Sequence, residues 1–143
     1  MARYVRGVCV MCFLVLLAAL PAQGGADITT ISVDDLDLYR DAGMTVIDVR
    51  RTDEWRSTGV IEGSTLITAF DGDGRLNPNF VAEVARIADP AKPLALICRS
   101  GRRSAVAAQL LTEQAGLTEV WSVDGGMNAW LGSHKPVAPC TSC

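Results

Sequence analysis

"PLALICRSGRRSAVAAQLL", residues 93–111, joins an apolar run, a short cationic segment and an alanine-rich segment. The continuous apolar run 93–98 predicts a buried strand. The segment 104–116 predicts a helix, because Ala and Leu dominate it and Gly116 is a suitable C-terminal stop. Cys98 is therefore expected where a strand meets the loop that leads into a helix.

The loop after Cys98 has the composition of a site that ionises a thiol. Arg99, Arg102 and Arg103 supply positive charge, and free N–H groups at a helix start add to it. Gly101 permits a close backbone turn. Because the thiolate is the nucleophilic form of cysteine, we expect Cys98 to be a nucleophile. The expected substrate-binding residues are Arg99, Ser100, Gly101, Arg102, Arg103 and Ser104.

Two of these residues have a second interpretation. Arg102 is equally well read as a solvated surface cation. Ser104 is expected to cap the helix with its hydroxyl rather than to bind substrate. His134 is the single histidine, and we expect it to be solvated in a polar segment without a catalytic partner. The loop itself must therefore activate Cys98.

Strand and helix patterns alternate along the rest of the chain. The other expected strands are 44–49, 64–68 and 119–123, and the other expected helices are 32–43, 51–59, 77–88 and a short one within 124–132. The strands are apolar with little alternation, which favours an α/β fold with a mostly parallel sheet covered by helices on both faces. In such sheets ligands bind beyond the carboxyl ends of the strands, where Asp48 and Cys98 fall.

No metal site is expected. The acidic loop 71–78 lacks the spacing of a calcium loop, because Leu76 and Ala82 occupy the positions that need glycine and glutamate.

The N-terminal residues read as a secretory leader. Arg3 and Arg6 precede an apolar run over 8–20, and small residues follow. We expect a signal peptide over 1–24, with cleavage between 22 and 26, and a periplasmic or secreted protein. An uncleaved anchor is the alternative, although the run is short for a membrane span. Cys9 and Cys12 begin the run rather than end it, so no lipoprotein is predicted.

Charge and cysteine content narrow the partners of the mature chain, a domain over 27–134 and a tail over 135–143. Loss of Arg3 and Arg6 would leave 11 basic against 16 acidic residues, a formal charge of −5. This balance argues against nucleic acid and against an anionic membrane surface as partners. Cys140 and Cys143 can pair in an oxidising compartment, which leaves Cys98 as the odd thiol.

The tail sequence "PCTSC" has three possible interpretations. Cys140 and Cys143 could form a local disulfide of little consequence, or a redox dithiol that resolves Cys98. They could also bind a soft metal, but two thiolates supply only half of a four-ligand site.

Four segments together resemble the rhodanese family of sulfurtransferases. They are "VIDVRRTDEW" (46–55), "GVIEGSTLI" (59–67), "CRSGRRSAVAAQLL" (98–111) and "VWSVDGGMNAW" (120–130), in the family order. The resemblance implies a rhodanese-like fold of about five strands, no cofactor, and a single-domain exported member. Asp48 and Arg50 match the "DVR" segment of the family, and we expect an ion pair that supports the active loop without taking part in the chemistry.

The resemblance also implies a reaction. Four residues separate Cys98 from Arg103, whereas related phosphatases have five, and Ser104 stands where their arginine would be. The shorter loop favours sulfane sulfur donors such as thiosulfate over phosphate esters or arsenate. Cys98 would carry a persulfide and pass its outer sulfur to a thiol or to cyanide. The alternatives are a non-catalytic sulfur-carrier or binding module, and a thiol redox protein that uses Cys140 and Cys143.

Overall fold

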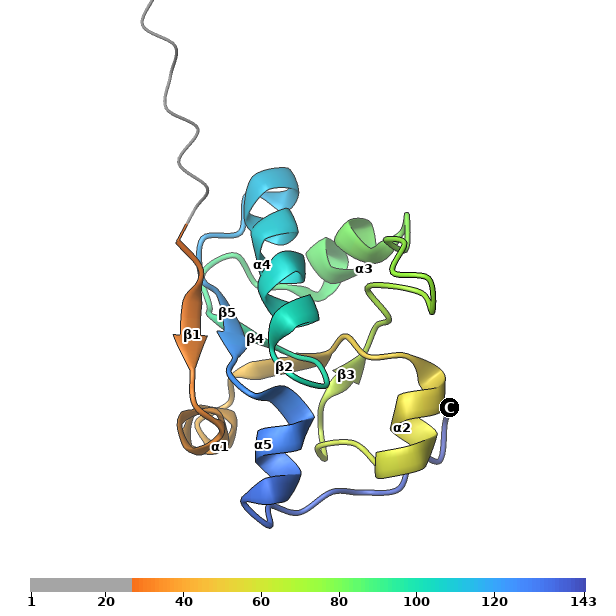
Figure 1. Ribbon diagram of the computed structural model, residues 1–143. Helices are drawn as coiled ribbons and strands as arrows, with labels where there is room; N and C mark the ends of the chain where they lie inside the picture. The colour runs from red at the N-terminus through yellow and green to blue at the C-terminus, as the bar shows by residue number, and fades with distance from the viewer. Residues whose placement is uncertain (1–26) are drawn as a thin grey trace, which may run out of the picture.

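The computed structural model describes residues 27–143 and has a five-stranded sheet at its centre (Figure 1). Its strands are β1 (Thr29–Ile31), β2 (Thr45–Asp48), β3 (Thr65–Leu66), β4 (Leu94–Ile97) and β5 (Val120–Val123). Their order is β1-β5-β4-β2-β3, and all paired strands are parallel. β4 lies in the centre, so all four of its residues are buried. The predicted leader, 1–24, lies outside the described residues.

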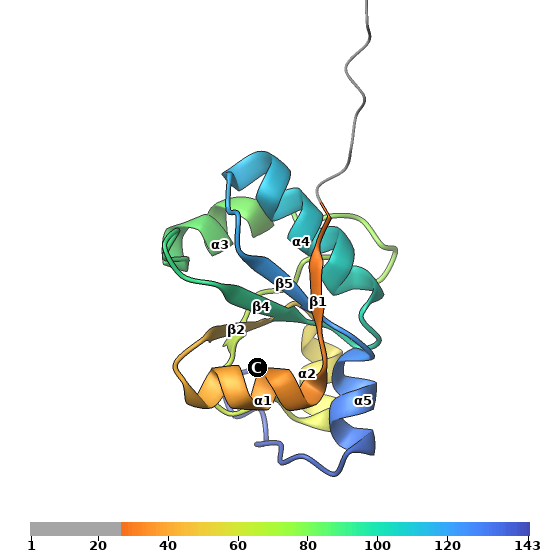
Figure 2. The same cartoon turned by 90° about the vertical axis from the view of Figure 1, so that its left-hand side faces the viewer.

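Helices cover both faces of this sheet (Figure 2). One face carries α3 (Phe80–Ile87) and α4 (Arg102–Ala115), and the other carries α1 (Val33–Asp41), α2 (Thr52–Thr58) and α5 (Gly126–Gly132). The α/β fold with helices on both faces is thereby confirmed. Among the described residues no helix has the length and hydropathy needed to cross a membrane.

Several element boundaries differ from the expected ones, among them the start of α3, which is at Phe80 rather than at residue 77. β1 had no individual prediction, because its three residues are too few to show a pattern. β3 is only two residues long, although 64–68 was expected. The helix expected from Ser104 begins two residues earlier, at Arg102.

The start of α1 follows directly from its sequence. The Ser32 hydroxyl accepts the Asp35 N–H at 3.1 Å, and the Asp35 carboxylate accepts the Ser32 N–H at 3.3 Å. This reciprocal pair is a capping box, which satisfies donors that an uncapped helix leaves free. The helix predicted over 32–43 thus has Ser32 as its N-cap.

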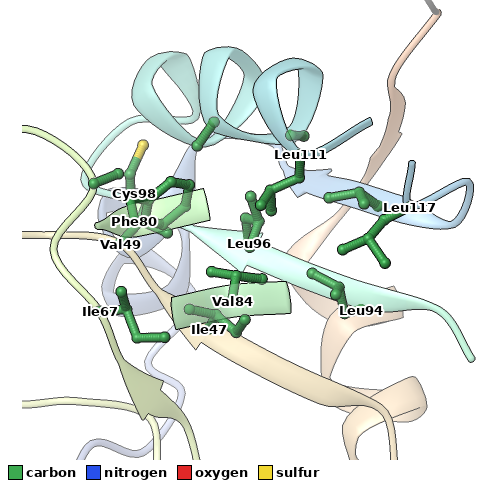
Figure 3. Packing of buried hydrophobic residues seen from close by; sticks show 14 residues of the cluster. Ile47, Val49, Ile67, Phe80, Val84, Leu94, Leu96, Cys98, Leu111 and Leu117 are labelled. Carbon is green, nitrogen blue, oxygen red and sulfur yellow. The ribbon is translucent and has the colours of Figure 1, made fainter. Parts of the chain in front are cut away.

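Two hydrophobic clusters fill the space between the sheet and its helices. The cluster under α3 and α4 includes Phe80, Val84, Leu96 and Leu111, with Cys98 at one end (Figure 3). The cluster on the other face is centred on α1 and α5 and includes Leu36, Val46, Ile97, Met127 and Trp130. Because β4 alternates between the two clusters, Cys98 is fixed in the core by the packing of the strand that precedes it.

The C-terminal segment runs past α5 to α2, where the chain ends (Figure 1). Val60 and Ala138 exchange two backbone hydrogen bonds, at 2.9 and 2.8 Å. The Trp130 indole donates to the Pro136 carbonyl at 2.9 Å. The tail is therefore part of the folded structure.

Candidate active site

The sulfur of Cys98 lies directly beneath the loop that joins β4 to α4. The Gly101 N–H donates a hydrogen bond to Sγ at 3.2 Å, and the Ser104 hydroxyl lies 3.5 Å from Sγ. Both donors belong to the N-terminal end of a 14-residue helix, where the helix dipole favours negative charge. The side chain of Cys98 has no exposed surface. The site is thus a polar pocket around one buried sulfur.

Gly101 gives the loop its shape. It is the N-cap of α4 and has a φ of 90°, a left-handed conformation that glycine adopts without strain. A Cβ at this position would lie 3.2 Å from the Val123 carbonyl oxygen, so the loop also passes close to β5. The predicted close turn at Gly101 is confirmed.

Ser104 does not cap α4, which corrects the expectation for this residue. Because the helix begins at Arg102, Ser104 lies within its first turn and is fully buried. Its hydroxyl lies 3.0 Å from the Gly101 carbonyl oxygen and 2.9 Å from the Ser122 hydroxyl on β5. Ser104 therefore links the loop, the sulfur and the neighbouring strand. Ser122 also belongs to the site, although no sequence motif indicated it.

The N-terminal end of α5 is hydrogen-bonded to the backbone of the cysteine loop. Met127 N–H donates to the Cys98 carbonyl at 2.8 Å, and Asn128 N–H donates to the Arg99 carbonyl at 3.0 Å. A Cβ on Gly126 would overlap the Cys98 carbonyl oxygen and the Arg99 backbone. The segment "GGMNAW" thus needs glycine where the two backbones meet.

The guanidinium of Arg103 is bound by a carboxylate from another helix. Its Nη1 and Nη2 donate to the two carboxylate oxygens of Glu54 on α2, at 2.8 and 2.6 Å. Glu54 also accepts the Arg51 N–H at 3.1 Å. The hydrogen bonds to Glu54 raise the pKa of Arg103 against the effect of burial. Burial opposes ionisation of Glu54, but its bonds from Arg103 and from the Arg51 backbone outweigh burial and lower its pKa.

Asp48 and Arg50 form a buried ion pair at the end of β2. Nε and Nη2 of Arg50 donate to the Asp48 carboxylate at 2.7 to 3.0 Å. The guanidinium also donates to the Thr58 hydroxyl at 2.6 Å and to the Gly59 carbonyl at 2.8 Å. The pair therefore ties the C-terminal end of α2 to the sheet, and α2 in turn carries the Glu54 that holds Arg103.

A cleft of about 570 Å³ lies over the cysteine loop. Arg99, Ser100, Arg102 and Arg103 form one wall of it. Phe70, Asp71, Gly72 and Gly74 of the acidic loop also line it, together with Arg51, Glu54 and Val106. Within the described part of the chain, Arg99 and Arg102 form no ion pair, so they are the cations free to meet an anion.

The tail cysteines lie elsewhere. Cys140 and Cys143 form a disulfide with a Cα–Cα distance of 5.7 Å. They line a second cleft, which shares no residue with the cleft over the cysteine loop. The structure thus brings Cys98 together with its loop but not with the tail. His134 is exposed, as expected.

Besides Ser122, Glu54 is a site residue that the sequence analysis missed. Its position four residues after Arg50, on the helix that follows β2, was the available signal, but only the packing of α2 against the loop shows its partner. In residues 27–143 no group of three or more His, Cys, Asp or Glu side chains has a metal-binding arrangement.

The chain is similar in sequence to known proteins of one family. Residues 32–133 match the family described as the Rhodanese-like domain. Rhodanese-like domain-containing protein 17 of Arabidopsis thaliana is 30% identical over 115 residues, which cover 77% of this chain and 72% of that protein. The thiosulfate sulfurtransferase GlpE of Stutzerimonas stutzeri is 33% identical over 108 residues, which cover 76% of this chain and 89% of the relative.

The fold is also similar to that of solved structures. The crystal structure of a rhodanese-related protein from Thermoplasma volcanium has a TM-score of 0.59 and 30% identity. The match covers 78% of this chain and 99% of that structure.

Proposed function

Because the chain belongs to the rhodanese-like domain family, whose relatives include sulfurtransferases, we propose that it transfers sulfane sulfur through Cys98. The observation that carries this proposal is the hydrogen bond from the Gly101 N–H to Cys98 Sγ at the N-terminal end of α4. A backbone donor and a helix dipole that converge on one sulfur favour its negatively charged, nucleophilic form.

The proposed donor is thiosulfate or a similar small anion. The thiolate of Cys98 attacks the outer sulfur of thiosulfate, the S–S bond breaks, and its electron pair leaves with sulfite. Cys98 then carries a persulfide. A thiolate acceptor, or cyanide in an assay, attacks the outer sulfur of this persulfide, and the Cys98 thiolate returns. The cycle needs no cofactor and no net oxidant.

Arg99 and Arg102 are proposed to attract and hold the sulfonate end of the donor. Both line the cleft over the cysteine loop without an ion-pair partner among the described residues. Arg103 is proposed to act differently, because Glu54 occupies two of its donors and leaves it a role in fixing the loop. Access of a donor to Sγ requires movement of the groups that cover it, since Cys98 is fully buried.

The loop length supports sulfur transfer over phosphate-ester hydrolysis. Four residues separate Cys98 from Arg103, and the next position is the buried Ser104. A phosphoryl group needs room for three equatorial oxygens around the attacked atom. A pocket already occupied by the Ser104 hydroxyl favours the smaller sulfur atom. An exported location, based on the predicted leader, remains part of the proposal.

The experiment combines mass and rate. The purified chain is incubated with thiosulfate, and intact mass is expected to rise by about one sulfur atom on Cys98. With cyanide present, sulfite release is expected from the wild type and is expected to fall by about a thousandfold or more in Cys98→Ser.

The double variant Cys140→Ser, Cys143→Ser is the control, and it should retain the wild-type rate. Equal rates in wild type and Cys98→Ser would remove Cys98 from the mechanism. A mass gain on Cys98 without turnover would instead favour the sulfur-carrier module. Loss of turnover in the tail variant with Cys98 intact would favour the redox alternative.

A further inference from the structure

The tail disulfide forms part of a cleft that the proposed sulfur transfer does not use. This cleft measures about 570 Å³ and lies between α2, the segment 60–66 and the tail residues 138–143. Both Cys140 and Cys143 line it, and both are partly exposed. A thiol in this cleft therefore has a sulfur–sulfur bond within reach.

The disulfide is not required to hold the tail in place. It closes a separation of only three residues, so it restrains little of the chain. The tail is already held by the backbone pair between Val60 and Ala138 and by the bonds from Arg56 to the Cys143 main-chain oxygen. A partly exposed disulfide that contributes little to the stability of the fold is the kind that reacts with thiols in thiol–disulfide exchange.

The cleft has unsatisfied hydrogen-bonding groups suited to a peptide backbone. Trp55 lines it, and the Trp55 Nε1–H is the one buried side-chain N or O atom of residues 27–143 without a hydrogen-bond partner. Because this atom is buried, a peptide carbonyl reaches it only if the side chains around it shift. Leu66 of β3 also lines it, and β3 is the last strand of the sheet, so its outer side has no strand partner in the described chain. Free strand edges bind extended peptides by backbone pairing.

We propose that this cleft is a thiol–disulfide exchange site for an extended, cysteine-containing peptide. The peptide would pair with the outer edge of β3, offer a carbonyl to the Trp55 indole, and present its thiol to the Cys140–Cys143 bond. Cys98 is not involved, because its cleft shares no lining residue with this one.

The exchange needs no further oxidant or reductant, because the tail disulfide is reduced and the peptide thiols are oxidised. Its thiolate attacks one sulfur of the Cys140–Cys143 disulfide, that bond breaks, and the electron pair leaves on the other sulfur, which takes a proton. The product is a mixed disulfide. A second thiol of the peptide, or of another peptide molecule, then attacks the peptide sulfur. The tail is left as a dithiol, and two peptide thiols are oxidised to a disulfide.

The test measures this exchange in the full chain carrying Cys98→Ser with its tail oxidised. The probe is a blocked pentapeptide with one cysteine between Thr and Val residues, which favour extended backbone. Trypsin releases residues 104–143 as one peptide, because Lys135 precedes proline, and this fragment contains Cys140 and Cys143 but not Cys98. The mixed disulfide on that fragment is quantified by mass spectrometry over time. If Cys98→Ser fails to fold, the same assay is carried out on the wild type, in which the fragment 104–143 still separates the tail cysteines from Cys98.

Two references isolate the contribution of the cleft. The free oxidised peptide of residues 135–143 has the same disulfide without the cleft, and we expect the folded chain to react about tenfold faster. A probe with proline on both sides of its cysteine cannot pair with a strand edge and should lose this advantage. Trp55→Phe should reduce it, whereas Trp121→Phe, outside the cleft, should not.

A folded chain that reacts no faster than the free tail peptide would overturn the proposal, as would equal rates with both probes. Because Cys98 is replaced in the assayed protein, failure of sulfur transfer at Cys98 would leave this result unaffected.

Discussion

Arg103 of α4 and Glu54 of α2 form a two-bond ion pair, with Nη1–Oε2 at 2.8 Å and Nη2–Oε1 at 2.6 Å. The pair joins the helix that follows the cysteine loop to a helix 49 positions earlier in the chain. Both side chains are partly buried, so water screens the pair less than it would on an open surface. The loop arginine is thus a structural cation as well as a part of the cleft wall.

This pair predicts a pH-dependent stability. The pKa of Glu54 is lowered from its ordinary value near 4.5, so its ionised form stabilises the fold above that value and loses this effect as pH falls through the lowered pKa. Glu54→Gln should lower the free energy of unfolding by about 1 kcal/mol at pH 7. The difference from wild type should shrink as pH falls below 4.5.

Urea unfolding followed by tryptophan fluorescence measures this difference at each pH. Glu113→Gln, an exposed position on α4, is the matched control and should have little effect. A Glu54→Gln deficit that stayed constant from pH 7 to well below the ordinary carboxylate range would contradict the assignment.

The Asp48–Arg50 pair predicts a larger effect. Both side chains are buried, so Asp48→Asn would leave the Arg50 guanidinium charged without a counterion in the core. A loss of about 3 kcal/mol or more is expected in the free energy of unfolding. Asp73→Asn, which affects an exposed pair with Arg75, should cost less than about 0.5 kcal/mol. Similar losses in the two variants would rule out the supporting role of the buried pair.

Contact between α5 and the cysteine loop predicts that Gly126 cannot carry a side chain. A Cβ there would overlap the Cys98 carbonyl, and the φ of 53° is unfavourable for alanine. Gly126→Ala should cost about 2 kcal/mol and reduce sulfite release by about tenfold or more, since the loop must shift. Gly132→Ala in the same helix meets open space and should be neutral or slightly stabilising. Full activity in Gly126→Ala would show that the loop tolerates displacement.

The two arginines of the cleft that are unpaired within residues 27–143, Arg99 and Arg102, are predicted to strengthen binding of the anionic donor. Arg99→Gln and Arg102→Gln should each raise the KM for thiosulfate by about threefold at low salt, with a smaller change in kcat. Added salt should reduce the difference, because it screens exposed charges. Arg86→Gln on α3, an exposed arginine outside the cleft, is the control. If Arg102→Gln left the KM unchanged while Arg99→Gln raised it, Arg102 would be a solvated surface cation.

Several features could be predicted because they depend on short-range patterns. The apolar runs 44–49, 93–98 and 119–123 contain β2, β4 and β5, and the Ser32 cap lies next to the helix that it caps. The position of Cys98 after a parallel strand followed from the same patterns. β1 and the short β3 could not be delimited, because a strand of two or three residues is defined by its neighbour rather than by its own sequence.

The role of Ser104 shows why the details of the site escaped prediction. Its expected function as a cap assumed that α4 begins at Ser104, but Gly101 turns the chain early and the helix starts at Arg102. The hydroxyl then points to Ser122, which is 18 positions away. Contacts of this range depend on the packing of α4 against β5, which no local pattern encodes.

The alternation of strands and helices, the cationic segment after Cys98 and the family resemblance could all be recognised before the fold was known, because each depends on contiguous residues. Three relationships became visible only in the folded chain: Glu54 pairs with Arg103, Arg50 holds the C-terminal end of α2, and Cys140 and Cys143 line a cleft separate from Cys98. The physical reason is that ion pairs and clefts form between side chains distant in sequence, and their partners are selected by the packing of whole elements.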